Sequence, residues 1–316
     1  MTFIQKAFRN LHPLIQFVFI ICVSLTGMSL AVFFGTFISA WVCGTGASLT
    51  ELISAMGNLE NKPGICANLI VNSINQILAF GAAGLAYTLL HGTAPGVGFS
   101  SMGKNQHLNK FLIGAVVVTL GFSPFLDLTY RLNEWLLVDG SKIHTMAAAY
   151  EAEAMRITMA MLKMETSKQL LATLFAVAVL PAVCEEWLFR GTIQPIFAKW
   201  SGNIHIGIWV SAFLFSAIHF QFFGFLPRLL LGAGFGYMVA ASGSLWPAVL
   251  GHFVNNGVAV LAAWWLGPEW IPEGMNPSEG SLGLAEAITS AIGAAAIIGS
   301  VWWLKEKTKF LEVRSQ

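Results

Sequence analysis

The chain has 316 residues, of which 56% are hydrophobic and only 10% charged, and its formal net charge is +1. A soluble domain carries about 25% charged residues, so this composition excludes an ordinary water-soluble globular protein. No basic block is interleaved with aromatic residues, which argues against a nucleic-acid partner. The charges stand in short clusters between long apolar stretches, and this pattern predicts an all-α, polytopic membrane protein in contact with the lipid bilayer.

About eight apolar stretches approach the length of about 20 residues that a helix needs to cross a bilayer. In chain order they are Leu14–Val42, Ile65–Leu90, Phe111–Tyr130, Lys168–Lys199, Ile204–Phe222, Leu226–Ala241, Leu245–Leu266 and Leu282–Leu304. The first stretch is too long for the core of a signal peptide, so we interpret it as a retained helix. Without an internal repeat or a polar linker, residues 1–316 are expected to form a single integral membrane domain.

The four cysteines show no CxxC or other metal-ligand spacing. Cys43 and Cys66 flank the loop between the first two predicted spans, where a disulfide can form. We expect free thiols in preference, because cysteines in or near apolar helices are usually unpaired.

A charged helix is predicted between the third and fourth spans. One apolar stripe follows helical spacing, and it consists of Tyr150, Ala154, Ile157, Met161 and Met164. Such a helix can lie along the membrane surface or pack against the bundle, and the pattern leaves both alternatives open.

Lysine and arginine in short loops indicate the orientation, because cytoplasmic loops carry an excess of them. One side carries Lys6, Arg9, Lys104, Lys110, Lys199, Lys305, Lys307, Lys309 and Arg314, and the other Glu51, Glu60, Glu269, Glu273 and Glu279 with Lys62. An even number of spans then places both termini in the cytoplasm. The absence of organelle signals and long loops favours a bacterial inner membrane.

Ionisable side chains inside the membrane are costly unless they are paired, so each of them is a candidate functional residue. In the fourth span, Glu186 and Arg190 are spaced for a helical ion pair with the acid N-terminal. Glu185 points about 100° away, so Arg190 cannot neutralise both carboxylates. One glutamate is therefore expected to be structural and the other available for chemistry.

Two further spans carry the remaining polar residues of this kind. His219 ends an apolar segment that begins with Phe215, and His252 and Asn256 share one face of the seventh span. Because Glu186 and His219 lie at nearly equal distances from a predicted turn at Gly202, we expect all six polar residues to converge in the cytoplasm-facing half. A buried glutamate near two imidazoles suits activation of water, and an asparagine amide suits stabilisation of an oxyanion. These groups together predict hydrolysis of an amide.

Three glycines at alternate positions, Gly232, Gly234 and Gly236, follow no strand and therefore form no dinucleotide-binding motif. In an apolar helix they are expected to allow close packing of a neighbouring helix.

The sequence resembles the CPBP intramembrane proteases (CaaX protease and bacteriocin-processing, also called Abi). The family's motifs EExxxR, FxxxH and HxxxN/D match Glu185-Glu186…Arg190, Phe215…His219 and His252…Asn256, in the same order. The motif-bearing core covers roughly residues 168–266. The resemblance implies a membrane-bound endopeptidase of the CaaX-prenyl protease type that acts on a membrane-associated or lipidated peptide or protein.

Under this interpretation Glu185 is the general base, helped by His219, and Glu186 and Arg190 orient the site. His252 and Asn256 would then stabilise the oxyanion. In a rival mechanism Glu185, His219 and His252 bind a divalent metal such as zinc; we favour the metal-free version. Two other function classes stay open: a non-catalytic scaffold or immunity protein that binds a peptide, and a proton-coupled transporter.

Overall fold

The structure is a computed structural model, and it describes residues 2–92, 108–136 and 141–267. The described residues form helices and no strands. Five of the helices are long and apolar enough to cross a membrane, and the helices Leu108–Phe122 and Ile204–Ala217 are apolar but shorter. The predicted fold class, an all-α membrane bundle, is therefore confirmed. The predicted eighth span, Leu282–Leu304, lies outside the described residues.

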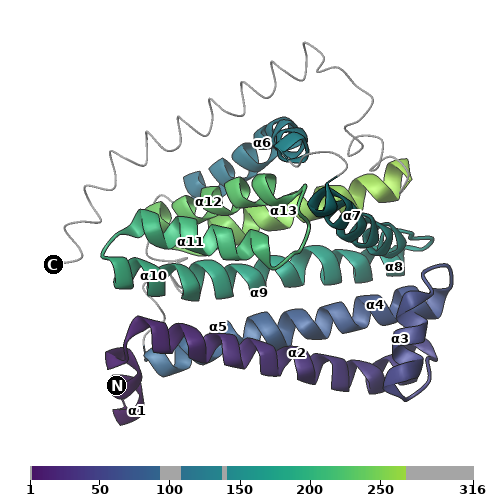
Figure 1. Ribbon diagram of the computed structural model, residues 1–316, viewed down its shortest axis with the longest axis horizontal. Coiled ribbons are helices and arrows are strands. Elements are labelled where there is room, and N and C mark those ends of the chain that lie inside the picture. Colours follow the sequence, from purple (N-terminus) through teal and green to yellow (C-terminus); the bar gives the residue numbers. More distant parts are fainter. Residues whose placement is uncertain (1, 93–107, 137–140, 268–316) are drawn as a thin grey trace.

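Three layers of helices make up the bundle (Figure 1). The N-terminal layer contains α1 (Phe3–Asn10), α2 (Pro13–Cys43), α3 (Leu49–Gly57), α4 (Lys62–Asn75), the π-helical segment η1 (Gln76–Gly81) and α5 (Ala82–His91). The middle layer is one long continuous helix built from α8 (Ser167–Thr173), η3 (Leu174–Val179), α9 (Leu180–Leu188), η4 (Phe189–Ile193) and α10 (Gln194–Ser201).

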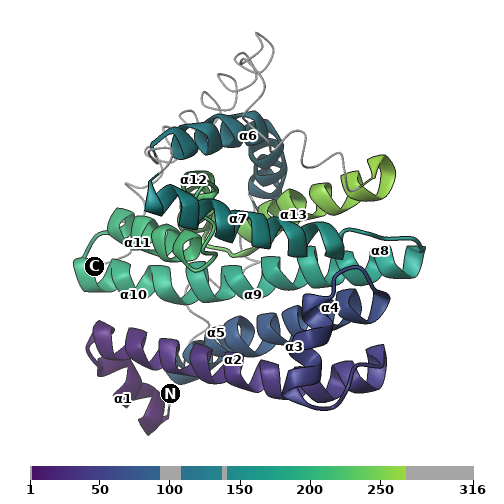
Figure 2. The ribbon, with the colours of Figure 1, turned by 45° about the vertical axis from the view of Figure 1, so that its right-hand side comes forward.

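The third layer contains α11 (Ile204–Ala217), α12 (Phe225–Ser242) and α13 (Trp246–Leu266). The helix α6 (Leu108–Leu136) packs against α12 and α13. The helix α7 (Lys142–Met161) contacts α4 and lies in front of the bundle in the turned view (Figure 2). Seven predicted spans thus correspond to helices. The fifth prediction was too long, because α11 ends at Ala217 and not at Phe222.

Two turns fix the order of the middle and third layers. Gly202 closes the α10–α11 turn with φ 67°, and Gly243 closes the α12–α13 turn with φ 65°. Glycine adopts this left-handed conformation without the steric cost of a Cβ atom. The turn that the sequence predicted at Gly202 is confirmed, and it folds α11 back along α10.

Prolines explain the two π-helical segments of the middle helix. In η3 the N–H of Leu180 bonds the carbonyl of Phe175, five residues back, directly before Pro181. In η4 the N–H of Gln194 bonds the carbonyl of Phe189 in the same way, directly before Pro195. Because proline has no N–H and its ring crowds the preceding turn, the helix widens there instead of continuing in α register. Both segments flank the stretch that carries the two glutamates.

Small residues allow α12 to approach the middle helix. The side chain of Arg190 donates to the carbonyl of Gly232 at 3.0 Å, and Gln194 donates to the carbonyl of Gly236 at 3.2 Å. A Cβ atom at Gly232 would lie 2.9 Å from Nη2 of Arg190. The expectation of close packing is therefore met at Gly232 and Gly236. At Gly234 a Cβ atom would meet no described atom within 4 Å.

We expect Gly232→Ala to lower stability by about 1–3 kcal/mol, because the added methyl group overpacks the contact with Arg190. Gly234→Ala is the matched control, and it should leave the melting temperature unchanged or raise it, because alanine favours a helix over glycine. Thermal unfolding of both variants in detergent measures the difference. Equal melting temperatures would contradict the close contact at Gly232.

A disulfide joins Cys43, at the end of α2, to Cys66 in α4, with a Cα–Cα distance of 5.8 Å. The expectation of free thiols was wrong for this pair, because the α2–α4 connection folds back and brings the two Cα atoms within bonding range. Cys22 and Cys184 are free thiols.

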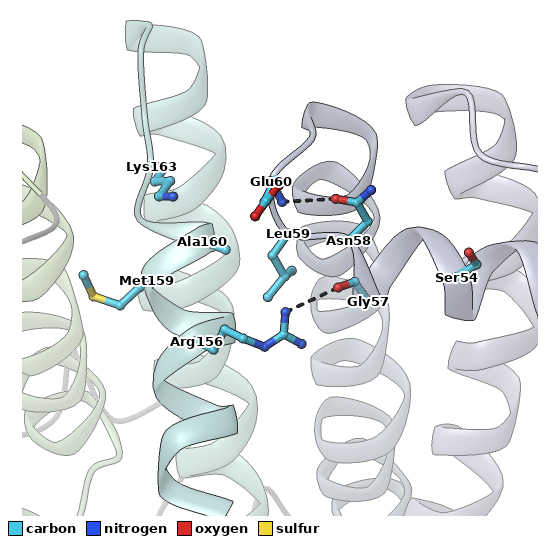
Figure 3. A pocket seen from close by; sticks show the side chains of 9 residues that line it. All are labelled: Ser54, Gly57, Asn58, Leu59, Glu60, Arg156, Met159, Ala160 and Lys163. Atoms are coloured by element: carbon cyan, nitrogen blue, oxygen red, sulfur yellow. Dashed lines mark hydrogen bonds between the residues drawn. The ribbon is translucent and has the colours of Figure 1, made fainter. Parts of the chain in front are cut away.

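The helix α7 packs against the bundle and forms one wall of a cavity of about 590 Å³ near the α3–α4 turn (Figure 3). Arg156 of α7 donates to the carbonyl of Gly57 across this cavity. It also hydrogen-bonds Glu153 and thereby lowers the pKa of that carboxyl. Ile143, Met146 and Tyr150 of α7 stay exposed, whereas Ala154, Ile157, Met161 and Met164 of the predicted stripe are partly buried, so most of that stripe packs on the bundle. The lining of the cavity includes no motif residue.

Candidate active site

The motif residues of the middle helix lie in the interior of the bundle. Glu186 and Arg190 are 0% and 1% exposed, and Nη1 of Arg190 donates to Oε1 of Glu186 at 2.7 Å. Glu185 is 5% exposed and takes no part in this ion pair. The prediction that Arg190 neutralises only one of the two glutamates is confirmed by this geometry.

His252 of α13 joins the two glutamates. Its Nδ1 lies 2.8 Å from Oε1 of Glu186, and its Nε2 lies 3.9 Å from Oε2 of Glu185. A carboxylate accepts hydrogen bonds, so Nδ1 of His252 carries the proton toward Glu186. In the neutral ring Nε2 is then an acceptor that faces Glu185. A separation of 3.9 Å exceeds a direct hydrogen bond and is the range in which a water molecule can bridge two groups.

Two aromatic rings enclose the charged centre. The guanidinium carbon of Arg190 lies 4.5 Å from the ring centroid of Phe215 and 5.8 Å from that of Phe235. The same two rings contact His252, Phe215 edge-on at 5.9 Å and Phe235 stacked at 6.0 Å. They offer the buried cation favourable π faces and exclude other side chains. Phe215 of the second motif therefore packs directly on the site.

His219 follows the end of α11 instead of lying in a membrane helix, which corrects the sequence-based placement. The chain closes in a tight turn here, where the N–H of His219 bonds the carbonyl of Ser216. The next residue, Phe220, has φ 52°, a strained value for a residue with a side chain. Nδ1 of His219 lies 2.7 Å from the carbonyl of Phe215 and so carries its proton, which leaves Nε2 as the free ring nitrogen.

The structure brings His219 to the site through Phe215, whose ring centroid lies 5.1 Å from that of the imidazole. Within the described residues the ion pairs of histidine with Glu185 and Glu186 are made by His252. His252, and not His219, is thus the imidazole closest to the expected general base.

Asn256 lies one turn beyond His252 and bonds the widened middle helix. Its Nδ2 donates to the carbonyl of Val177 at 3.0 Å, and Asn72 of α4 donates to the carbonyl of Ala176 at 3.0 Å. In the π register the carbonyl of Ala176 faces Pro181, which has no N–H to offer. Two amides from opposite layers therefore satisfy neighbouring carbonyls of η3. One N–H of the Asn256 amide is used in this way, and the second is free to act elsewhere.

The sequence-based prediction missed Gln76 and Phe235. Gln76 donates to Oε1 of Glu185 at 2.7 Å, and Phe235 stacks on His252. A signal for Gln76 existed, because Asn68, Asn72 and Gln76 recur every four residues inside an apolar span. No comparable signal marked Phe235, one of many aromatic residues in apolar helices.

The described residues contain no group of three or more His, Cys, Asp or Glu side chains arranged to hold a metal ion. Nδ1 of His252 is turned to Glu186, and Nδ1 of His219 is turned to a backbone carbonyl. This leaves Nε2 as the nitrogen of each imidazole that is open to a metal, and hydrogen bonds of this kind are usual for Nδ1 of a metal-bound histidine. The mechanism below is written for the metal-free alternative.

The middle helix and α13 thus bring a buried Glu–Arg–His cluster together inside a helical bundle. Residues 167–258, which contain all seven motif residues, match the family model described as type II CAAX prenyl endopeptidase Rce1-like. The resemblance drawn from the three motifs is therefore confirmed for this segment, which is similar to the CAAX-type peptidases.

One curated relative is similar over a stretch of comparable length. The chain is 28% identical over 96 residues to the uncharacterized protein YpbD of Bacillus subtilis (strain 168). This stretch covers 29% of the chain and 46% of the relative, so less than half of the relative's length is spanned. No solved structure matches the chain.

Proposed function

We propose that the protein is an intramembrane endopeptidase of the CaaX-prenyl protease type, which hydrolyses a peptide bond of a membrane-associated or lipidated peptide or protein with a glutamate-activated water. The observation that carries this proposal is that the two glutamates have different partners. Glu186 is held by Arg190 and His252, which leaves Oε2 of Glu185 and Nε2 of His252 facing one another at 3.9 Å.

In the first step Glu185 takes a proton from a water molecule while the water oxygen attacks the carbonyl carbon of the scissile bond. Nε2 of His252 accepts the second hydrogen of this water in a hydrogen bond and so orients it. Glu186 keeps the ring in the tautomer that leaves Nε2 free, as a carboxylate does for a catalytic histidine elsewhere.

In the second step the carbon–nitrogen bond breaks, and Glu185 returns its proton to the leaving amine. The products are a carboxylic acid and an amine. The oxyanion of the intermediate accepts a hydrogen bond from the free N–H of Asn256, which would supply ~3 kcal/mol. His219 takes no part in these two steps. Its Nδ1 is bound to the carbonyl of Phe215, which leaves Nε2 available, so we assign His219 to the orientation of the substrate.

The decisive experiment compares protein and peptide termini by mass spectrometry in cells that lack the protein and carry either the wild type or Glu185→Ala. We expect specific new termini with the wild type alone, and these termini identify the substrates and show whether they carry a lipid. Equal termini in the two strains would overturn Glu185 as the base and favour a peptide-binding scaffold. Cleavage that survives chelation in protein free of metal excludes zinc.

We also propose an orientation with both termini in the cytoplasm of a bacterial cell, in its inner membrane. The Cys43–Cys66 disulfide supports it, because disulfides persist in oxidising compartments and this one lies at the far end of α2 from the N-terminus. Rapid alkylation of intact cells followed by mass spectrometry should recover the disulfide-linked peptides. Recovery of both cysteines as alkylated thiols would contradict this orientation.

A further inference from the structure

The carboxylate of Glu185, a residue of the middle helix, is held from the N-terminal layer. Nε2 of Gln76, the first residue of η1, donates to Oε1 of Glu185 at 2.7 Å in a buried contact across 109 residues of sequence. Gln76 is 6% exposed and lies outside the segment 167–258 that the family model covers.

The backbone that carries Gln76 is held by close packing. The segment η1 is widened, and the N–H of Ala82 bonds the carbonyl of Ile77, five residues back. A Cβ atom at Gly27 of α2 would lie only 2.1 Å from the carbonyl oxygen of Leu78, so α2 touches η1 backbone to backbone. Because this segment is fixed, the amide of Gln76 is held in one position relative to Glu185.

This hydrogen bond makes the two oxygens of Glu185 unequal. Oε1 accepts the N–H of Gln76, and Oε2 is the oxygen 3.9 Å from Nε2 of His252. A proton that Glu185 takes up is then favoured on Oε2, because the donated N–H stabilises the negative charge on Oε1 and makes Oε1 the less basic oxygen. The bond also holds the carboxylate against rotation about its last torsion angle, which is otherwise soft.

We propose that Gln76 is a positioning residue for the general base: it fixes Glu185 so that Oε2 faces the water and receives the proton. This inference rests on the proposed function of Glu185. A second observation supports it. Oε1 of Gln76 is buried and has no hydrogen-bond partner. A buried acceptor without a partner lowers stability, so stability alone does not account for an amide at this position.

The test uses Gln76→Met, which keeps the length of the side chain and removes the donor. Gln16→Met is the matched control, because Gln16 is 1% exposed and donates to the carbonyls of Phe8 and Leu11, away from the site. With a substrate identified from the termini, we expect kcat to fall ~10- to 100-fold in Gln76→Met, with KM unchanged. Gln16→Met should keep the kcat of the wild type.

Infrared spectroscopy supplies a second readout that needs no turnover. The carboxylate band of Glu185 is isolated as the difference between the wild type and Glu185→Gln. This band should shift in Gln76→Met and stay in place in Gln16→Met. A normal kcat in Gln76→Met beside an inactive Glu185→Gln, or an unshifted band, overturns the inference alone. If Glu185→Gln itself cleaves like the wild type, the proposed function fails and the inference fails with it.

Discussion

Arg190→Met should nearly abolish accumulation of the protein in the membrane. Arg190 is 1% exposed, and its removal strands the carboxylate of Glu186, which is 0% exposed. Breaking a buried ion pair from one side costs about 3–5 kcal/mol, a large part of the stability of an ordinary domain. Immunoblots of membrane fractions and the melting temperature of any purified protein measure the loss.

The double variant Glu186→Gln with Arg190→Met is the control for this prediction. It removes both charges, and replacing a buried ion pair as a whole is often neutral for stability. We expect accumulation to recover while cleavage stays absent, since His252 no longer has a carboxylate to fix its tautomer. Normal amounts of the Arg190→Met single variant would show that the pair is not the structural centre of the bundle.

Glu185→Gln should lower kcat ~10²- to 10⁴-fold, the range that a general base contributes. The substitution keeps the shape of the side chain, and the amide oxygen can still accept the N–H of Gln76, so the fold should be kept. The quantity to measure is the rate of substrate cleavage by purified protein in detergent or liposomes, together with the melting temperature.

Glu151→Gln is the matched control for Glu185→Gln. Glu151 is also a glutamate inside the fold, 9% exposed, but it lies on α7 and accepts a hydrogen bond from Gln221. Its substitution should leave most of the turnover intact. A comparable loss in both variants would mean that any missing buried carboxylate disables the protein, and Glu185 would lose its special role.

The positions of the helices were predictable because the bilayer imposes a length and a composition on each span. The Glu186–Arg190 pair was predictable as well, because the partners are four residues apart on one helix. The end of α11 was not, since aromatic and aliphatic residues continue up to Phe222 while the helix already ends at Ala217. Hydropathy measures composition and does not register where backbone hydrogen bonds change.

Contacts between segments that are distant in the sequence could not be predicted either. The pairing of Gln76 with Glu185 and that of Cys43 with Cys66 depend on how layers face one another, and one sequence gives only the face of each helix. The same holds for His252, whose closeness to both glutamates follows from the tilt and rotation of α13. The contact of His252 with the two glutamates could be expected from depth, but the atoms that pair could not.

The two amides of the second span that bond the middle helix have a consequence for the biogenesis of the protein. Asn72 and Gln76 belong to the second span, whereas their partners Ala176 and Glu185 belong to a span that leaves the ribosome about 100 residues later. At synthesis rates of about 5–20 residues per second, these amides wait for several seconds in the membrane without their native partners. The second span is thus inserted before the helix that satisfies its amides has been synthesised. Membrane chaperones that shield polar side chains would bind the second span in this interval.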